Sequence, residues 1–395
     1  MFLKYYIRKE FFMIKKISIK KVVILTIIFT FSLFLSTLYA ESITYDDATI
    51  IAEQKAIELS SNNCGDLLEI KPLYDLQQKI SAYYYQYQYF YIIIGVNKSD
   101  VPIIEYGDNE FFLHNVIKTQ NLLIEDIEYL YLGNLRYGYL YNNEYYIINY
   151  GKVEKIDKKV YVDNTEVIKT PDAEEQWKIL EEYITDGNSS YKSGEITNPF
   201  NYEKYYYSSS GTNVPSYNYA YEIMDSFTGY TDHCSPTAAV NLLKYWYLRD
   251  TTKYNCLLKT SWTNTFKLLY SYMGTNTNGT GTVRSNIKTG YQKFFSTCNG
   301  LGSVFVDYIA SPSFTEMENE IQAGYPFHLS VIQNNYYKNH SLIALGYRTF
   351  TYKNGTTYTG VHYFLVADGW NTSARYVNCS INNGGVAMTR VRLSK

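Results

Sequence analysis

Three residues that together could act on an acyl group lie in the second half of the chain: Cys234, His340 and Asp368. A thiol nucleophile needs a base within hydrogen-bonding reach and a third group that orients the base. Cysteine attacks as its thiolate, which a neighbouring imidazolium stabilises. The three residues therefore predict nucleophilic thiol chemistry, with Cys234 as the nucleophile, His340 as the base and Asp368 as the orienting residue.

The residues that follow Cys234 are typical of a buried helix. Pro236 suits the first helical turn. Apolar residues then recur at helical spacing: Ala238, Ala239, Leu242, Leu243 and Trp246. We expect Cys234 at the N-terminus of this helix, where backbone N–H groups and the helix dipole favour the thiolate over the thiol.

The expected base and its orienting residue belong to strand-like segments. His340 opens an apolar run that ends at Tyr347, and Asp368 follows a second apolar run. A rival assignment takes His362 as the base and Asn378 as its orienting residue, with Cys234 unchanged. The first assignment is favoured because residues 324–331 are expected to form a strand, and only a brief polar connection separates this strand from His340.

The remaining histidines of this half of the chain predict no chemistry. His233 adjoins the nucleophile, and consecutive side chains at a helix start diverge, so it is expected at the rim of the site. His328 lies inside an apolar run and is expected in the core. We predict no cofactor and no metal, because ligand pairs at metal spacing are absent from the residues that could form a zinc site (His233, Cys234, His340, His362 and Cys379).

Composition and the N-terminus limit the partners. Lys and Arg number 36 against 38 Asp and Glu, so no basic surplus suggests a nucleic acid partner. A basic stretch, an apolar run from Val22 to Leu35 and a small-residue cleavage signal at Ala40 predict a secretory signal peptide over residues 1–40. The apolar run is shorter than the roughly 20 residues of a membrane span. We expect a secreted protein, extracellular or associated with the cell surface, without a stable span once the signal is removed.

Five cysteines are too few and too scattered for a disulfide framework. A bridge between Cys256 and Cys298 is conceivable in an exported protein, but the sequence leaves the pairing open. One of the five thiols must stay unpaired in any case.

The chain is long enough for two globular cores, and 46% of its residues are hydrophobic. Residues 41–185 predict a small α+β domain, in which a helix containing Ala48 to Leu59 packs on short aromatic-rich strands. Residues 186–217 are rich in Ser, Asn, Gly, Lys and Tyr and predict an exposed linker open to cleavage. Residues 218–395 predict a second domain, with helices first and an antiparallel sheet at the end.

The motifs of this second domain resemble the papain-like cysteine peptidases. In that family a histidine starts an apolar strand ending Gly-Tyr, as in residues 340–347, and a later strand ends with Asn or Asp, a small residue and Trp, as in residues 363–370. Cys234-Ser-Pro-Thr-Ala-Ala looks most like secreted bacterial members such as streptopain and the peptidases that trim bacteriocin leaders. The resemblance implies an α+β papain-like fold, cleavage of a peptide or protein substrate, and a role for Trp370 in shielding the hydrogen bond between Asp368 and His340.

The resemblance also implies a precursor, in which residues 41–185 form an intramolecular propeptide that covers the cleft until the linker is cut. One family feature is missing, because papain-like enzymes place a Gln before the cysteine as an oxyanion donor and no Gln lies between Trp177 and Cys234. The sequence does not choose a substitute among Asn213, Asn218, Tyr230 and His233. Two alternatives therefore stay open: a thiol acyltransferase or amidase on the same fold, and a catalytically inactive surface or adhesion module.

Overall fold

The protein is described from a computed structural model, which covers residues 42–60, 65–108, 110–133, 135–149, 151–158, 173–187, 206–334, 337–354, 356–379 and 385–393. The predicted signal peptide, residues 1–40, lies outside these ranges. None of the helices within them has the length and hydropathy that a membrane span requires.

The first part of the described chain is a helix on a sheet, as the sequence predicts. Helix α2 (Tyr45–Ser60) is capped by Thr44, whose Oγ1 accepts a hydrogen bond from the Asp47 N–H at 3.2 Å, and the helix packs on β3. The other elements of this part are β1 (Leu67–Tyr74), β2 (Ile80–Tyr87), β3 (Tyr91–Gly95), β4 (Ile103–Gly107), α3 (Phe112–Thr119), β5 (Glu128–Tyr131), β6 (Tyr137–Tyr141), β7 (Glu144–Asn149), β8 (Lys152–Ile156) and α5 (Ala173–Gly187).

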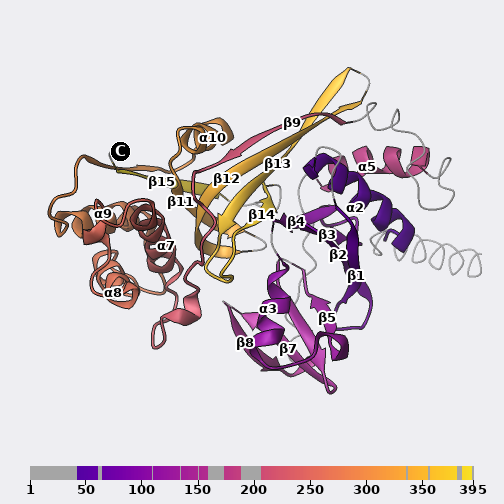
Figure 1. Ribbon diagram of the computed structural model, residues 1–395, viewed down its shortest axis with the longest axis horizontal. Coiled ribbons are helices and arrows are strands. Elements are labelled where there is room, and N and C mark those ends of the chain that lie inside the picture. Colours follow the sequence, from indigo (N-terminus) through magenta and orange to yellow (C-terminus); the bar gives the residue numbers. More distant parts are fainter. Residues whose placement is uncertain are drawn as a thin grey trace, which may run out of the picture. The chain divides into compact units, whose positions relative to one another are not determined.

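The second part of the chain also follows the predicted order, with helices before strands. Its helices are α7 (Cys234–Arg249), α8 (Trp262–Tyr272), α9 (Arg284–Ser296) and α10 (Phe314–Gln322). Its strands are β9 (Tyr206–Asn213), β10 (Val304–Ile309), β11 (Phe327–Asn334), β12 (Lys338–Asn354), β13 (Thr357–Ala367), β14 (Arg375–Asn378) and β15 (Gly385–Leu393). Together the two parts give a mixed α+β architecture (Figure 1).

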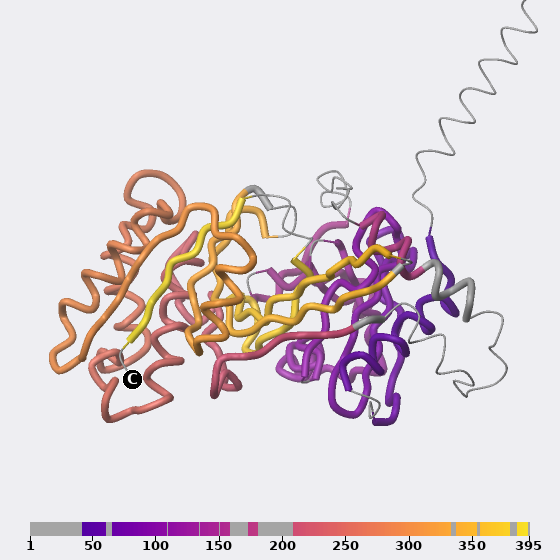
Figure 2. The backbone as a smooth tube through the Cα atoms, turned by 90° about the horizontal axis from the view of Figure 1, so that it is seen from above, coloured from indigo at the N-terminus to yellow at the C-terminus, as the bar shows by residue number. Residues whose placement is uncertain are grey.

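The described strands form one 15-stranded sheet rather than two separate sheets. Its order is β10-β15-β11-β12-β13-β14-β4-β3-β2-β1-β5-β6-β7-β8, and β9 pairs with β12. The two parts meet where β14 runs antiparallel to β4, with Tyr376 opposite Tyr106 and Val377 opposite Glu105. The long strands β12 and β13 extend from the side of α7 toward the first part of the chain (Figure 2).

Residues Ile43–Lys395 form one compact unit, in which the two regions that the sequence predicts as domains share one sheet. All five residues of β4 are buried, so this strand needs a neighbour on each side. The rings of Tyr106 and Tyr376 stack across the junction with centroids 4.6 Å apart. Strand pairing and aromatic packing at the junction make one hydrophobic core of the two predicted ones.

The segment predicted as a linker, residues 186–217, contains regular structure over part of its length. Helix α5 continues to Gly187, and residues 206–213 form β9 along β12. Serine and tyrosine are compatible with an edge strand, and Gly211 permits a close approach, because a Cβ there would lie 2.3 Å from the carbonyl oxygen of Tyr347. Residues 188–205 lie outside the described ranges.

Candidate active site

The structure places Cys234 at the first position of α7, as the sequence predicts. Its side chain is half-buried. Helix α7 packs against β12, the strand that carries His340, and Cys234 and His340 line one cleft. The two side chains are close enough to shift each other's pKa, and the main chain of Ser341 also lowers the pKa of the Cys234 thiol. The helix terminus and the strand thus deliver a nucleophile and a base to one point.

The orientation of the His340 ring is fixed by its other nitrogen. Nε2 lies 2.7 Å from the main-chain oxygen of Asp368. A carbonyl oxygen only accepts hydrogen bonds, so Nε2 must carry the proton and donate it, which leaves Nδ1 as the basic nitrogen. The ring packs against two aromatic rings, those of Tyr337 at 5.4 Å and Trp370 at 4.8 Å between centroids, which also contact each other. This packing restricts the rotation of the imidazole.

Asp368 reaches the imidazole with its main chain, whereas the sequence predicts contact through its carboxylate. The carboxylate accepts hydrogen bonds from the Trp370 N–H at 3.0 Å and the Tyr337 hydroxyl at 3.3 Å. Arg375 donates to the same carboxylate through Nε at 3.1 Å and Nη2 at 2.6 Å. Four donors therefore hold the carboxylate on the side away from His340.

The electrostatics favour an ion pair between the nucleophile and the base. Burial raises the pKa of the Cys234 thiol, but the hydrogen bond and charge of His340 outweigh burial, so that this pKa lies below its usual value. Burial lowers the pKa of His340, while Cys234 and then Asp368 raise it more, so that it lies above its usual value. Both shifts favour thiolate with imidazolium, the form in which a cysteine nucleophile is most reactive.

A cleft of about 1180 Å³ surrounds Cys234 and His340. One side is formed by residues 224–235 and another by residues 280–284, 330–332 and 338–341. From the first part of the chain, Asn149, Lys152 and Glu154 line the same cleft. Cys234 remains half-buried and not fully enclosed by this lining. The expectation that residues 41–185 cover the cleft therefore stays a prediction.

The structure separates the four candidate oxyanion donors. Tyr230 and His233 line the cleft, whereas Asn213 and Asn218 are absent from its described lining. The imidazole of His233 is buried, contacts the Thr237 hydroxyl through Nδ1 at 3.0 Å and packs edge-on against an aromatic ring. Tyr230 is therefore the better placed side chain, beside the backbone N–H groups at the start of α7 that have no acceptor within the helix.

The rival base and its partner do not meet. His362 Nδ1 lies 2.9 Å from the hydroxyl of Thr349, and its ring packs on Phe314. Asn378 donates to the side chain of Gln176 at 2.9 Å. Neither residue is in the described lining of the cleft that holds Cys234. His340 is thus the histidine that the structure brings to the thiol.

Three residues that support the site were missed from the sequence: Tyr337, Arg375 and Glu105. Arg375 bonds Asp368 on one side and, through Nη1 at 2.6 Å, Glu105 of β4 on the other. One signal was available, because Glu105 is the single charged residue in the apolar strand Ile103–Gly107. A buried charge in such a strand needs a partner.

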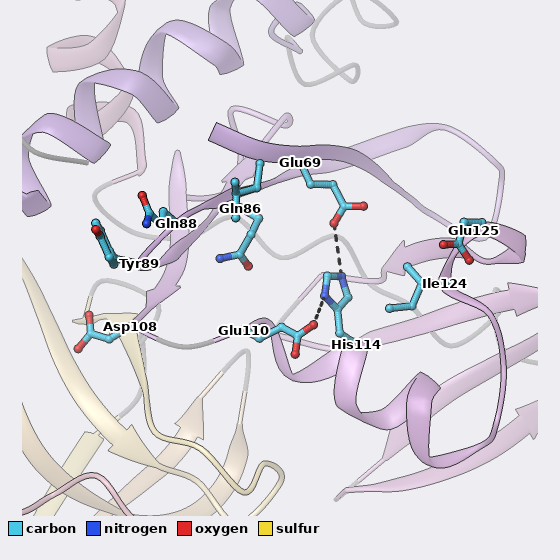
Figure 3. Close-up of a pocket in the computed structure, with 10 residues that line it drawn as sticks. Glu69, Gln86, Gln88, Tyr89, Asp108, Glu110, His114, Ile124 and Glu125 are labelled. Atoms are coloured by element: carbon cyan, nitrogen blue, oxygen red, sulfur yellow. Dashed lines mark hydrogen bonds and ion pairs between the residues drawn. The ribbon is translucent and has the colours of Figure 1, made fainter. Parts of the chain in front are cut away.

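A second pocket lies in the first part of the chain, around His114 (Figure 3). Its imidazole Nδ1 lies 3.1 Å from Glu110, and Nε2 lies 3.8 Å from Glu69. Lys118 and Lys71 already pair with these two carboxylates, at 2.7 Å and 3.2 Å. Within the described ranges, no three His, Cys, Asp or Glu side chains are placed to hold a metal ion.

Comparison with known proteins agrees with the chemistry of the larger cleft. A search of curated proteins gives no match. Residues 211–384, somewhat less than half of the chain, match the family model described as the Peptidase_C39 like family. The matched segment contains Cys234, His340 and Asp368, and the match supports a cysteine peptidase of the papain-like superfamily.

Proposed function

We propose that the protein is a secreted cysteine endopeptidase that is made as a precursor and hydrolyses peptide bonds through Cys234, His340 and Asp368. The observation that carries the proposal is that one cleft holds the Cys234 thiol, at the N-terminus of α7, and the His340 imidazole, whose Nε2 lies 2.7 Å from the Asp368 carbonyl oxygen. The match of residues 211–384 to a peptidase family supports it independently.

In the proposed mechanism the three residues act in sequence. The thiolate of Cys234 attacks the scissile carbonyl carbon, and backbone N–H groups at the start of α7 stabilise the oxyanion that forms. The His340 imidazolium then gives its Nδ1 proton to the leaving amine, which departs and leaves an acyl-enzyme. Neutral His340 removes a proton from the water that hydrolyses the thioester. The carbonyl oxygen of Asp368 keeps Nε2 protonated and the ring in place throughout.

The precursor is proposed from the order of segments along the chain. Residues 1–40 carry the features of a secretory signal, and residues 188–205 continue the polar composition that favours cleavage. Incubating the intact precursor with a peptide library tests whether the first part inhibits the enzyme. Full activity without any cut would contradict inhibition and leave the peptidase proposal standing.

The peptidase proposal is tested with the same library and the variants Cys234→Ala and His340→Ala. We expect new N-termini, identified by mass spectrometry, that both variants abolish while His362→Ala preserves them. An added primary amine distinguishes the alternative, because a thiol acyltransferase would form a stable amide with it instead of the free acid. Cleavage that survives in Cys234→Ala would contradict the proposed nucleophile.

A further inference from the structure

A buried chain of charges runs behind His340 and crosses between the two parts of the molecule. Arg375 of β14 bonds the carboxylate of Asp368 with Nε and Nη2, and that of Glu105 with Nη1. The side chains are 3%, 1% and 0% exposed, respectively. Because the three side chains are buried, none of them can replace a lost partner with water, and the charge of each depends on the other two for its stabilisation.

The chain of charges limits how Asp368 can turn. Its carboxylate would be the better acceptor for an imidazolium, yet it faces Arg375 and its main-chain oxygen faces His340 Nε2. Glu105 holds the far side of the guanidinium, and the Tyr91 hydroxyl bonds Glu105 at 3.0 Å. A planar guanidinium held at both edges cannot follow a rotation of Asp368.

Glu105 belongs to the first part of the chain, so the site depends on that part. Other contacts join the same two parts. Strand β4 pairs with β14, and the Tyr217 hydroxyl donates a hydrogen bond to Asp108 at 3.2 Å. Gly151 lies so close to Trp370 that a Cβ on it would be 3.0 Å from the Trp370 carbonyl oxygen. A propeptide that dissociates after cleavage would take Glu105 with it and leave Arg375 without one of its buried partners.

We propose that Glu105 and Arg375 are positioning residues for His340, and that the first part of the chain is a permanent half of the enzyme that stays bound after any cut in residues 188–205. This inference rests on the proposed function for its activity readout. Its main readout is the alkylation of Cys234, which needs no peptide cleavage.

The positioning role is tested with Glu105→Gln and Arg375→Lys in the chain without its predicted signal peptide. The first variant keeps the shape of the side chain and removes its charge, and the second keeps the charge and removes the two-edged guanidinium. We expect the pH midpoint of Cys234 alkylation to rise by about one unit in each, since one pKa unit corresponds to a tenfold change in the protonation equilibrium. After a cut within residues 188–205, we expect kcat/KM on a peptide to be at least about tenfold lower in each variant than in the unsubstituted protein at neutral pH.

A matched control is Glu58→Gln in α2. Glu58 is also a buried carboxylate of the first part, but its partners are Lys55 at 3.2 Å and the Tyr352 hydroxyl at 2.8 Å, whereas Glu105 pairs with Arg375. It should leave the alkylation midpoint unchanged. If Glu105→Gln does not fold, Tyr91→Phe removes only the hydrogen bond to Glu105 and should give a smaller rise.

The permanence of the first part is tested by inserting a specific protease site between residues 188 and 205. After the cut, both fragments should elute together in size-exclusion chromatography and keep the alkylation midpoint of the uncut chain. Separation of the fragments with the midpoint retained would overturn the inference, as would unchanged midpoints in folded Glu105→Gln and Arg375→Lys. A low midpoint without any peptide cleavage would instead contradict the proposed function alone.

Discussion

Replacing Trp370 by alanine tests whether the ring protects the hydrogen bond that orients the base. The indole centroid lies 4.8 Å from those of His340 and Tyr337, and Trp370 follows Asp368, whose carbonyl accepts that bond, by two residues. The main-chain N–H of Trp370, which bonds the Asp368 carboxylate, remains in the variant. Trp370→Ala therefore changes the shielding and leaves the anchoring of Asp368 in place.

The expected loss follows from the strength of that bond. A hydrogen bond from a charged group contributes about 1.5–3 kcal/mol when water is excluded. If water competes for Nε2 and that contribution is lost, kcat/KM should fall by about tenfold to a hundredfold, at roughly 1.4 kcal/mol for each factor of ten. Trp370→Phe keeps an aromatic ring over the bond and should lose distinctly less.

The assay is kcat/KM on a fluorogenic peptide, with urea unfolding of each variant to show that it is folded at the assay temperature. Removing a half-buried tryptophan costs stability as well, about 2 kcal/mol when scaled from fully buried cases. An unchanged kcat/KM in folded Trp370→Ala, or equal losses in the alanine and phenylalanine variants, would refute the shielding argument.

Two further predictions concern buried groups away from the chemistry. Burial, with the charge of His340, lowers the pKa of His328 from 6.5 to about 3. As the pH falls, His328 therefore takes up a proton in the unfolded chain before it does so in the folded protein. The free energy of unfolding should then fall by up to about 1.4 kcal/mol per pH unit below 6.5. His328→Gln, which can still bond the Tyr291 hydroxyl, should flatten this slope in acid-unfolding curves, and an unaltered slope would show that other groups cause it. Cys256 and Cys298 are free thiols, and the Cys298 thiol donates a hydrogen bond to the main-chain oxygen of Cys256 at 3.4 Å, across 42 residues of chain. Oxidised glutathione should join the two thiols, with the loss of two hydrogen masses and a gain of about 4 kcal/mol in unfolding free energy from loop closure. Recovery of glutathione adducts without the internal bridge would contradict that prediction.

The short-range spacing of apolar residues predicted the helix and the strands that position the site residues. The helical spacing after Pro236 and the apolar runs near His340 and Asp368 are short-range features, and α7, β12 and β13 confirm them.

Long-range features could not be predicted in this way. The junction of β14 with β4 joins strands some 270 residues apart, and no pattern within either strand names its neighbour. The side of Asp368 that faces His340 depends on Arg375, and the position of Arg375 depends on Glu105 across that junction. For this reason the structure has the main-chain oxygen of Asp368 bonded to His340, whereas the sequence predicts its carboxylate.

The central claim is a thiolate–imidazolium pair between Cys234 and His340. The most direct measurement is the pH dependence of Cys234 alkylation, resolved from the other cysteines by mass spectrometry, in the chain without its signal peptide and in His340→Ala and His362→Ala. We predict a midpoint well below the ordinary thiol value of about 8.5, lost in His340→Ala and retained in His362→Ala. An ordinary thiol titration in all three proteins would contradict the account.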